Sequence, residues 1–166
     1  MSKLIIAIDP DVDKSGLAVL NTESKRYVLV KSVGISELLT IIPTYAHDDQ
    51  CAIFVEAGYL NASNWHTLNA KNKAMAAAIG NSTGRNHETA RKIVELLKDY
   101  LRLPNVHEVK PLRKCWRGKD GKITHDELVA MTGFDKTRSN QDERDAALLA
   151  WYYSNLPMII KPNTKK

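Results

Sequence analysis

Short apolar runs separated by polar or turn-forming residues occupy the first third of the chain. Each run is rich in β-branched and aliphatic residues, which favours strands over helices. The runs that predict three successive strands are 4–8, 16–20 and 27–30. A short helix is expected over 36–42, closed by Pro43, and the continuous apolar run 51–55 predicts a fourth strand buried on both faces. This order indicates a three-stranded meander followed by a helix and a further strand.

The pattern changes to a helical period in the second half. Residues 87–101 predict an amphipathic helix with one apolar face, formed by Ala90, Ile93, Val94, Leu97 and Leu101. A fifth strand is expected at 106–109, followed by a basic loop from Lys110 to Lys122. Between Gly58 and Gly84 the chain is rich in Asn and Gly and is predicted to be irregular, although 70–79 has the composition of a helix.

Two further helices are predicted near the end of the chain. Thr124 with Glu127 three residues later forms a capping-box pattern, and this helix is expected to stop at Gly133. The last helix should begin near Asn140 or Gln141 and end near Ser154.

Length and composition limit the class of protein. The 166 residues, 43% of them hydrophobic and 26% charged, predict one folded domain at 1–158, with a basic tail at 159–166. The sequence has no apolar run of membrane-spanning length and no leader pattern, so we expect a cytoplasmic protein without a membrane partner. Lys and Arg outnumber Asp and Glu by 24 to 19, for a net charge of +5, which is compatible with a polyanionic partner.

Acidic residues follow apolar elements at three places. Asp9 ends the first predicted strand, Glu56 ends the fourth, and Asp142 and Asp145 open the last helix, where a spacing of three puts both on one face. Converging carboxylates repel one another and suit hard divalent cations such as Mg²⁺ or Mn²⁺. Two such ions about 3.5–4 Å apart would support phosphodiester hydrolysis.

Each acid also has a structural interpretation. Asp142 could complement a helix dipole, and Asp9 before Pro10 could be a turn residue. Glu56 is harder to explain this way, because it directly follows a run of buried residues and a buried carboxylate needs a partner. The combination of the acids therefore favours a site over any one of them alone.

The ordered set resembles the RuvC family of Holliday junction resolvases, within the RNase H-like or retroviral-integrase superfamily. The pieces that carry the resemblance are Ile6-Ala7-Ile8-Asp9-Pro10, Ser15-Gly16-Leu17-Ala18-Val19, Ile53-Phe54-Val55-Glu56 and Asp142-Glu143-Arg144-Asp145-Ala146. The resemblance implies an α/β, RNase H-like fold with a mixed five-stranded sheet flanked by helices. The chain departs from the family's pattern at Asp11, where the family usually has glycine after Asp-Pro.

The resemblance also implies a function and its residues. It implies that the catalytic, metal-binding carboxylates are Asp9, Glu56, Asp142 and Asp145, with Glu143 as a fallback ligand. They would hold two Mg²⁺ ions, for which Mn²⁺ could substitute. Tyr59 takes the place of an aromatic residue that helps open bases at the junction. Lysines that contact the phosphate are sought among Lys110, Lys114, Lys119 and Lys122. The implied activity is metal-dependent cleavage of four-way or other branched DNA by a homodimer, whose contact would lie within 70–101.

Other interpretations share much of this pattern. A ribonuclease H or a YqgF-like RNA-processing enzyme would have the same acids and differ in substrate. A non-catalytic junction-binding module would bind branched DNA without Mg²⁺ and would not cleave it. Solvated loop charges are the plain alternative for the lysines, and a partly buried loop aromatic is the alternative for Tyr59.

Overall fold

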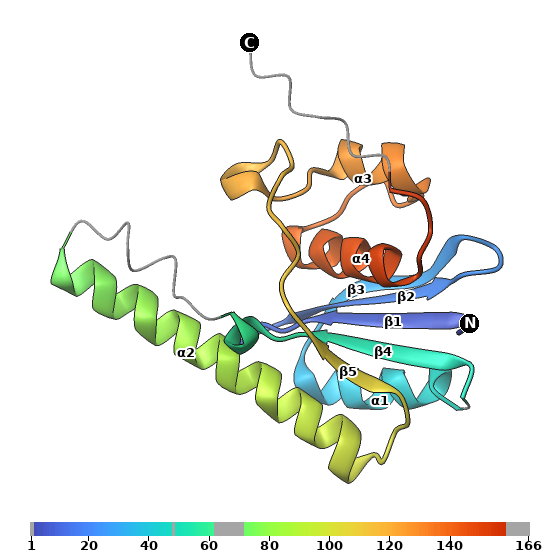
Figure 1. Cartoon of the computed structure of the whole chain (residues 1–166), viewed down its shortest axis with the longest axis horizontal. Helices are drawn as coiled ribbons and strands as arrows, with labels where there is room; N and C mark the ends of the chain where they lie inside the picture. Colours follow the sequence, from blue (N-terminus) through green and yellow to red (C-terminus); the bar gives the residue numbers. More distant parts are fainter. Residues whose placement is uncertain (1, 48, 62–71, 159–166) are drawn as a thin grey trace.

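A five-stranded sheet in the order β3-β2-β1-β4-β5 forms the centre of the molecule (Figure 1). The computed structural model describes residues 2–47, 49–61 and 72–158. The strands are β1 (Leu4–Asp9), β2 (Ser15–Asn21), β3 (Arg26–Val33), β4 (Cys51–Glu56) and β5 (Val106–Val109). The first three strands pair antiparallel, whereas β4 runs parallel to both β1 and β5. The predicted mixed five-stranded α/β fold is confirmed.

Helices cover both faces of the sheet. They are α1 (Ile35–Tyr45), α2 (Lys73–Glu95), α3 (His125–Thr132) and α4 (Gln141–Tyr153), with short turns η1 (Gly58–Leu60), η3 (Leu96–Tyr100) and η4 (Lys119–Gly121). Helix α4 packs across β1, β2 and β3, while α1 and α2 lie on the opposite face (Figure 1). Among the described residues, no helix combines the length and apolar character needed to cross a bilayer.

The strand period of two divides the core into two layers. Along β1, Ile5 and Ala7 pack toward α4, whereas Ile6 and Ile8 pack toward α1 and α2. All four side chains are at most 4% exposed. A residue's position along its strand therefore decides which helical layer it meets.

Two helix predictions were wrong in extent. Helix α1 continues through Pro43 to Tyr45, and Pro43, which has no N–H, leaves one hydrogen bond of the last turn unmade. Helix α2 is continuous from Lys73 across the Gly80–Gly84 segment that was predicted to be irregular. The low helix propensity of each glycine, about 1 kcal/mol relative to alanine, does not break the helix. The rest of the predicted irregular segment, at 62–71, lies outside the described residues.

The predicted caps are present. Thr124 and Glu127 form a reciprocal capping box at the start of α3, and Gly133 ends this helix in the left-handed region. A second capping box, which the sequence interpretation did not include, joins Asn140 to Glu143 at the start of α4. The expected basic tail at 159–166 lies outside the described residues.

Candidate functional site

Asp9 and Glu56 lie side by side at one edge of the sheet. Both end parallel neighbouring strands, and the register pairs Ile8 with Val55 just before them. Ala7 and Phe54, two residues earlier, face the α4 layer, so the strand period turns Asp9 and Glu56 toward α4 as well. The sequence alternation alone thus places two carboxylates beneath the same helix.

A close approach between β2 and α4 brings the remaining two acids to this edge. Gly16 pairs with Asp9 across the β1–β2 ladder. A Cβ atom on Gly16 would lie 2.0 Å from the backbone oxygen of Asp142, so only glycine lets α4 begin here. The first turns of α4 then direct Asp142 and Asp145 into the space above Asp9.

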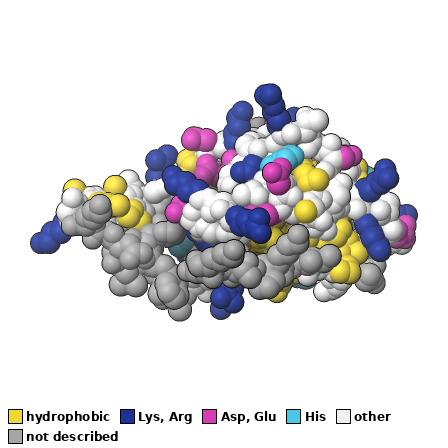
Figure 2. Space-filling model, turned by 90° about the horizontal axis from the view of Figure 1, so that it is seen from above, with side chains coloured by type: hydrophobic (Ala, Val, Ile, Leu, Met, Phe, Trp, Pro, Cys, Tyr) yellow, Lys and Arg dark blue, Asp and Glu magenta, His cyan; other side chains and the backbone are white. Residues whose placement is uncertain are grey.

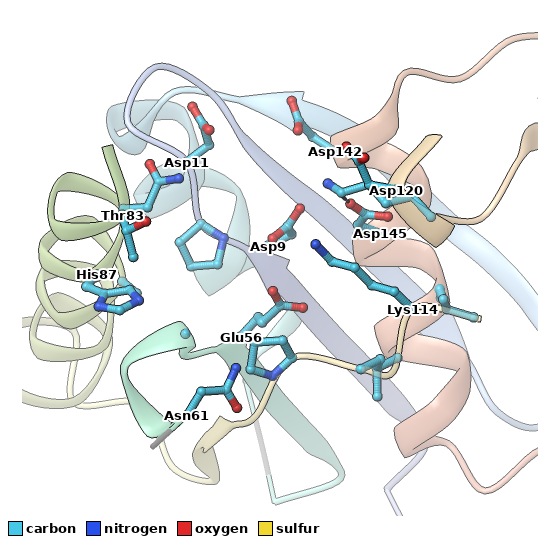
Figure 3. A pocket seen from close by; sticks show the side chains of 18 of the residues that line it. Asp9, Asp11, Glu56, Asn61, Thr83, His87, Lys114, Asp120, Asp142 and Asp145 are labelled. Atoms are coloured by element: carbon cyan, nitrogen blue, oxygen red, sulfur yellow. Dashed lines mark hydrogen bonds and ion pairs between the residues drawn. The ribbon is translucent and has the colours of Figure 1, made fainter. Parts of the chain in front are cut away.

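The four predicted acids line one open pocket with a volume of about 1390 Å³ (Figure 3). Small-molecule pockets usually measure about 300–1,000 Å³, so the space suits a larger ligand. Asp11 and Asp120 add two carboxylates that the sequence interpretation did not assign to the site, and Thr83 and His87 of α2 form the opposite wall. The Asp120-Gly121 pair signals a turn, but nothing local predicts that this turn lies over the pocket.

Burial and mutual repulsion disfavour the ionised forms of the acids in the pocket. Burial, together with the charges of Glu56, Asp145 and Asp142, raises the pKa of Asp9 well above its usual value. Burial and the charge of Asp145 raise the pKa of Glu56 to about 7. Burial and the charges of Asp11 and Asp145 also raise the pKa of Asp142. Such a cluster is stabilised by added positive charge.

Two of the four candidate lysines supply part of that charge. Lys122 Nζ lies 2.8 Å from Asp145 Oδ2. Burial lowers the pKa of Lys122, but its hydrogen bond and the charges of Asp145, Asp9 and Glu56 outweigh this and raise it. Lys114 lines the pocket and lowers the pKa of Glu56 (Figure 3). Lys110 and Lys119 are exposed on the same loop and are not among the lining residues.

A polar layer behind Asp145 was missed by sequence reasoning. Gln141 Nε2 donates to Asp145 Oδ1 at 2.6 Å. Arg144 in turn donates to Gln141 Oε1 at 2.9 Å, to the Ile123 carbonyl at 3.0 Å and to the Ser139 carbonyl at 2.5 Å. Arg144 therefore joins the basic loop to α4 and fixes the amide that orients Asp145.

Glu143 does not take part in the pocket. Its carboxylate accepts from the Asn140 backbone N–H at 3.1 Å and from Lys136 Nζ at 2.8 Å, and the residue is only 8% exposed. In the structure the suggested fallback ligand is therefore a helix cap and ion-pair partner, and it does not line the pocket.

Tyr59 lies beside the pocket in a polar cluster. Its hydroxyl donates to Glu108, the Arg91 guanidinium carbon lies 4.4 Å from its ring centre, and His87 meets it edge-on. Burial and the hydrogen bond to Glu108 raise the pKa of Tyr59 to about 12. The aromatic side chain is near the candidate site but is engaged by its neighbours.

Charges of both signs are interspersed on the face over α3. Figure 2, which views the molecule from this side, shows Lys and Arg side chains spread over the surface with Asp and Glu side chains among them. Among the described residues, the positive side chains are therefore not gathered into one block on this face.

The donor set fits a divalent metal ion. All four acids offer carboxylate oxygens, and burial together with the charges of neighbouring acids raises the pKa values of Asp9, Glu56 and Asp142. The Lys122 ammonium already forms an ion pair with Asp145. Within the described residues, however, no three Asp, Glu, His or Cys side chains are close enough together, as they stand, to hold one ion. Mg²⁺ usually keeps several water ligands and needs only one or two carboxylates for each ion, so the acids of the pocket still fit it.

Comparison with known proteins gives the fold class. No family model matches the sequence, and no curated protein matches it. The solved structure of Thermus thermophilus RuvC in complex with a Holliday junction substrate superimposes with a TM-score of 0.54, over 89% of this chain and 90% of that chain, at 15% sequence identity. A second Thermus thermophilus RuvC structure gives a TM-score of 0.45 at 16% identity, over 89% of this chain and 90% of that chain. The chain therefore has a RuvC-type, RNase H-like fold.

Proposed function

We propose that this protein is a divalent-metal-dependent endonuclease that resolves four-way or other branched DNA junctions. The observation that carries the proposal is the meeting of Asp9, Glu56, Asp142 and Asp145, from two strands and a helix, in a single pocket. Acids held this way against their own repulsion are typical of sites that bind Mg²⁺ and act on phosphodiesters. The fold likeness to a nuclease bound to a Holliday junction supports the same substrate class.

The proposed roles follow from position. Asp9 and Glu56 project from strand ends and form a rigid floor, while Asp142 and Asp145 hold the opposite side on α4. Two bound Mg²⁺ or Mn²⁺ ions would activate a water molecule and stabilise the leaving oxygen. The four acids would need to be ionised to hold them, which makes binding weaker at low pH.

The basic loop would position the DNA backbone. Lys114 lines the pocket and Lys122 reaches Asp145, so both lie where a phosphate beside the acids would need positive charge. Lys110 and Lys119 lie farther out and would add phosphate contacts that are independent of sequence. Tyr59 would stack on an unpaired base once its ring is released from Arg91.

A homodimer would supply the two active sites that symmetric cleavage requires. The exposed half of α2 supports this part of the proposal. The buried residues of this helix lie near its C-terminal end, at Ala90, Ile93 and Val94. Its N-terminal half projects away from the sheet (Figure 1). The N-terminal half of α2 contains two glycines and buries no face, so it gains little stability from its own domain. We propose that a second copy of the protein packs against it.

The test is cleavage of a synthetic four-way junction with and without Mg²⁺, next to a linear duplex, an RNA–DNA hybrid and a structured RNA. We expect symmetric nicks in the junction by the parent protein and none by Asp145→Asn. Asp135→Asn removes an exposed acid outside the pocket and should leave cleavage unchanged.

Three results would contradict the proposal. Preference for the hybrid would indicate a ribonuclease H, and preference for structured RNA would indicate an RNA-processing enzyme. Tight junction binding without cleavage at any Mg²⁺ concentration would indicate a binding module.

A further inference from the structure

Both carboxylate oxygens of Asp145 are already engaged. Oδ2 accepts from Lys122 Nζ at 2.8 Å, and Oδ1 accepts from Gln141 Nε2 at 2.6 Å. The side chain of Asp145 is 17% exposed and that of Lys122 is 36% exposed, so the pair is partly shielded from water. Asp145 thus has no oxygen free of a protein donor.

The charge of Lys122 acts on the whole cluster. It partly offsets the repulsion around Asp9, Glu56 and Asp142, and lies within electrostatic reach of all three. Between partly buried groups, a single charge changes the binding of another cation more strongly than it would in water. The same ammonium that stabilises the acids therefore opposes any other positive ion.

The side chain of Lys122 can leave Asp145 without moving the loop. The Lys122 carbonyl accepts from the Gly118 N–H at 2.8 Å, and its N–H donates to the Lys119 carbonyl at 3.1 Å. The next residue, Ile123, is 1% exposed and its carbonyl accepts from Arg144. The backbone is fixed on both sides, while the long side chain retains its rotamers.

We infer that Lys122 is an internal counter-cation that competes with the divalent ion for Asp145. The inference rests on the proposed metal-dependent function and deepens it, by naming what the ion must displace. Within the described residues Asp145 is held by Lys122 and Gln141 rather than standing open to a metal ion. Divalent binding then includes the cost of breaking this ion pair.

The test is calorimetric titration of the DNA-free protein with Mn²⁺ at one pH, for the parent, Lys122→Met and Lys119→Met. Methionine keeps most of the length of the side chain and removes the charge. We expect Lys122→Met to bind Mn²⁺ at least tenfold more tightly than the parent. Lys119, on the same loop but outside the pocket, is the matched control, and its variant should bind as the parent does.

A second readout protects against misfolding of the variant. Without metal, Lys122→Met should melt at a lower temperature than the parent, because the acids lose their counter-charge, and Mn²⁺ should raise its melting temperature more. Lys122→Arg, which keeps the charge, should bind Mn²⁺ about as the parent does.

The two proposals fail in different ways. If the parent binds Mn²⁺ and Asp9→Asn weakens that binding, but Lys122→Met binds no more tightly than the parent, the competition is overturned and the proposed function stands. If neither the parent nor Lys122→Met binds Mn²⁺, both the competition and the metal-dependent function are overturned.

Discussion

Gly16 lies directly against the first turn of α4, so that a Cβ atom at this position would be 2.0 Å from the backbone oxygen of Asp142. The same glycine pairs with Asp9 in the β1–β2 ladder. One residue without a side chain thus sets the separation between the sheet edge that carries Asp9 and the helix that carries Asp142 and Asp145.

Gly16→Ala should therefore damage stability and activity together. The added methyl group must push α4 away from the sheet, an overpacking that costs about 1–3 kcal/mol. We expect this loss in urea unfolding, with junction cleavage reduced at least tenfold. Gly34→Ala, where a Cβ meets nothing within 4 Å, is the control and should cost less than about 1 kcal/mol as an N-cap change. Equal losses in the two variants would contradict the role given to Gly16.

Glu56 should make the metal-free protein sensitive to pH. Its pKa is raised from 4.5 to about 7 in the folded state, so between these values the folded protein binds more protons than the unfolded chain. Stability contributed by the protonated group is therefore lost as pH rises through this window. Glu56→Gln should gain stability relative to the parent as pH rises from about 4.5 to 7, by on the order of 2–3 kcal/mol.

Urea unfolding of both proteins across this pH range, in the presence of a chelator, measures the effect. Saturating Mn²⁺ should abolish the gain, because the ion replaces the proton as the partner of Glu56. A stability difference that does not change with pH would show that Glu56 does not carry the raised pKa.

Arg144 should matter for stability although it does not reach the pocket. Arg144→Ala would remove donors from the Ile123 and Ser139 carbonyls and from Gln141 Oε1. Loss of charged hydrogen bonds of this kind costs about 1–3 kcal/mol in unfolding free energy. Arg138→Ala, at an exposed position six residues earlier, should change stability by less than about 0.5 kcal/mol. A neutral Arg144→Ala would show that the loop is held by other contacts.

Lys114 and Lys119 should differ in their effect on DNA. Lys114 lines the pocket, whereas Lys119 is exposed outside it. Using the inactive Asp145→Asn protein, binding of a junction should weaken more with Lys114→Ala than with Lys119→Ala. The slope of log affinity against log salt should fall by about one for Lys114→Ala if this lysine contacts a phosphate. An unchanged slope would remove Lys114 from the DNA contact.

The sequence is sufficient to predict the strands of the sheet and the positions of the acids at their ends. Strand alternation is local, so the apolar runs ending at Asp9 and Glu56 determine which face each carboxylate joins. Helix caps also depend on residues that are close together in the sequence, so the start and end of α3 were predicted correctly. The Gly and Asn residues within α2 were misleading, because they lower helix propensity without preventing a helix that has no steric conflict.

The contacts around Asp145 could not be predicted in the same way. Lys122 and Asp145 are 23 residues apart, and their contact depends on the turn at Gly118–Gly121 and on the bonds of Arg144 to the loop. Four lysines occupy that loop, and its sequence does not indicate which of them faces the acids. The pocket wall formed by Thr83 and His87 likewise depends on the path of α2 over the sheet edge.

Anomalous diffraction from crystals of the protein soaked in Mn²⁺ would locate the bound ions directly. We expect two peaks about 3.5–4 Å apart. They should be bound by oxygens of Asp9, Glu56, Asp142 and Asp145, with the Lys122 ammonium displaced from Asp145. Peaks elsewhere on the protein, or a fully ordered pocket without a peak at saturating Mn²⁺, would contradict the proposed function.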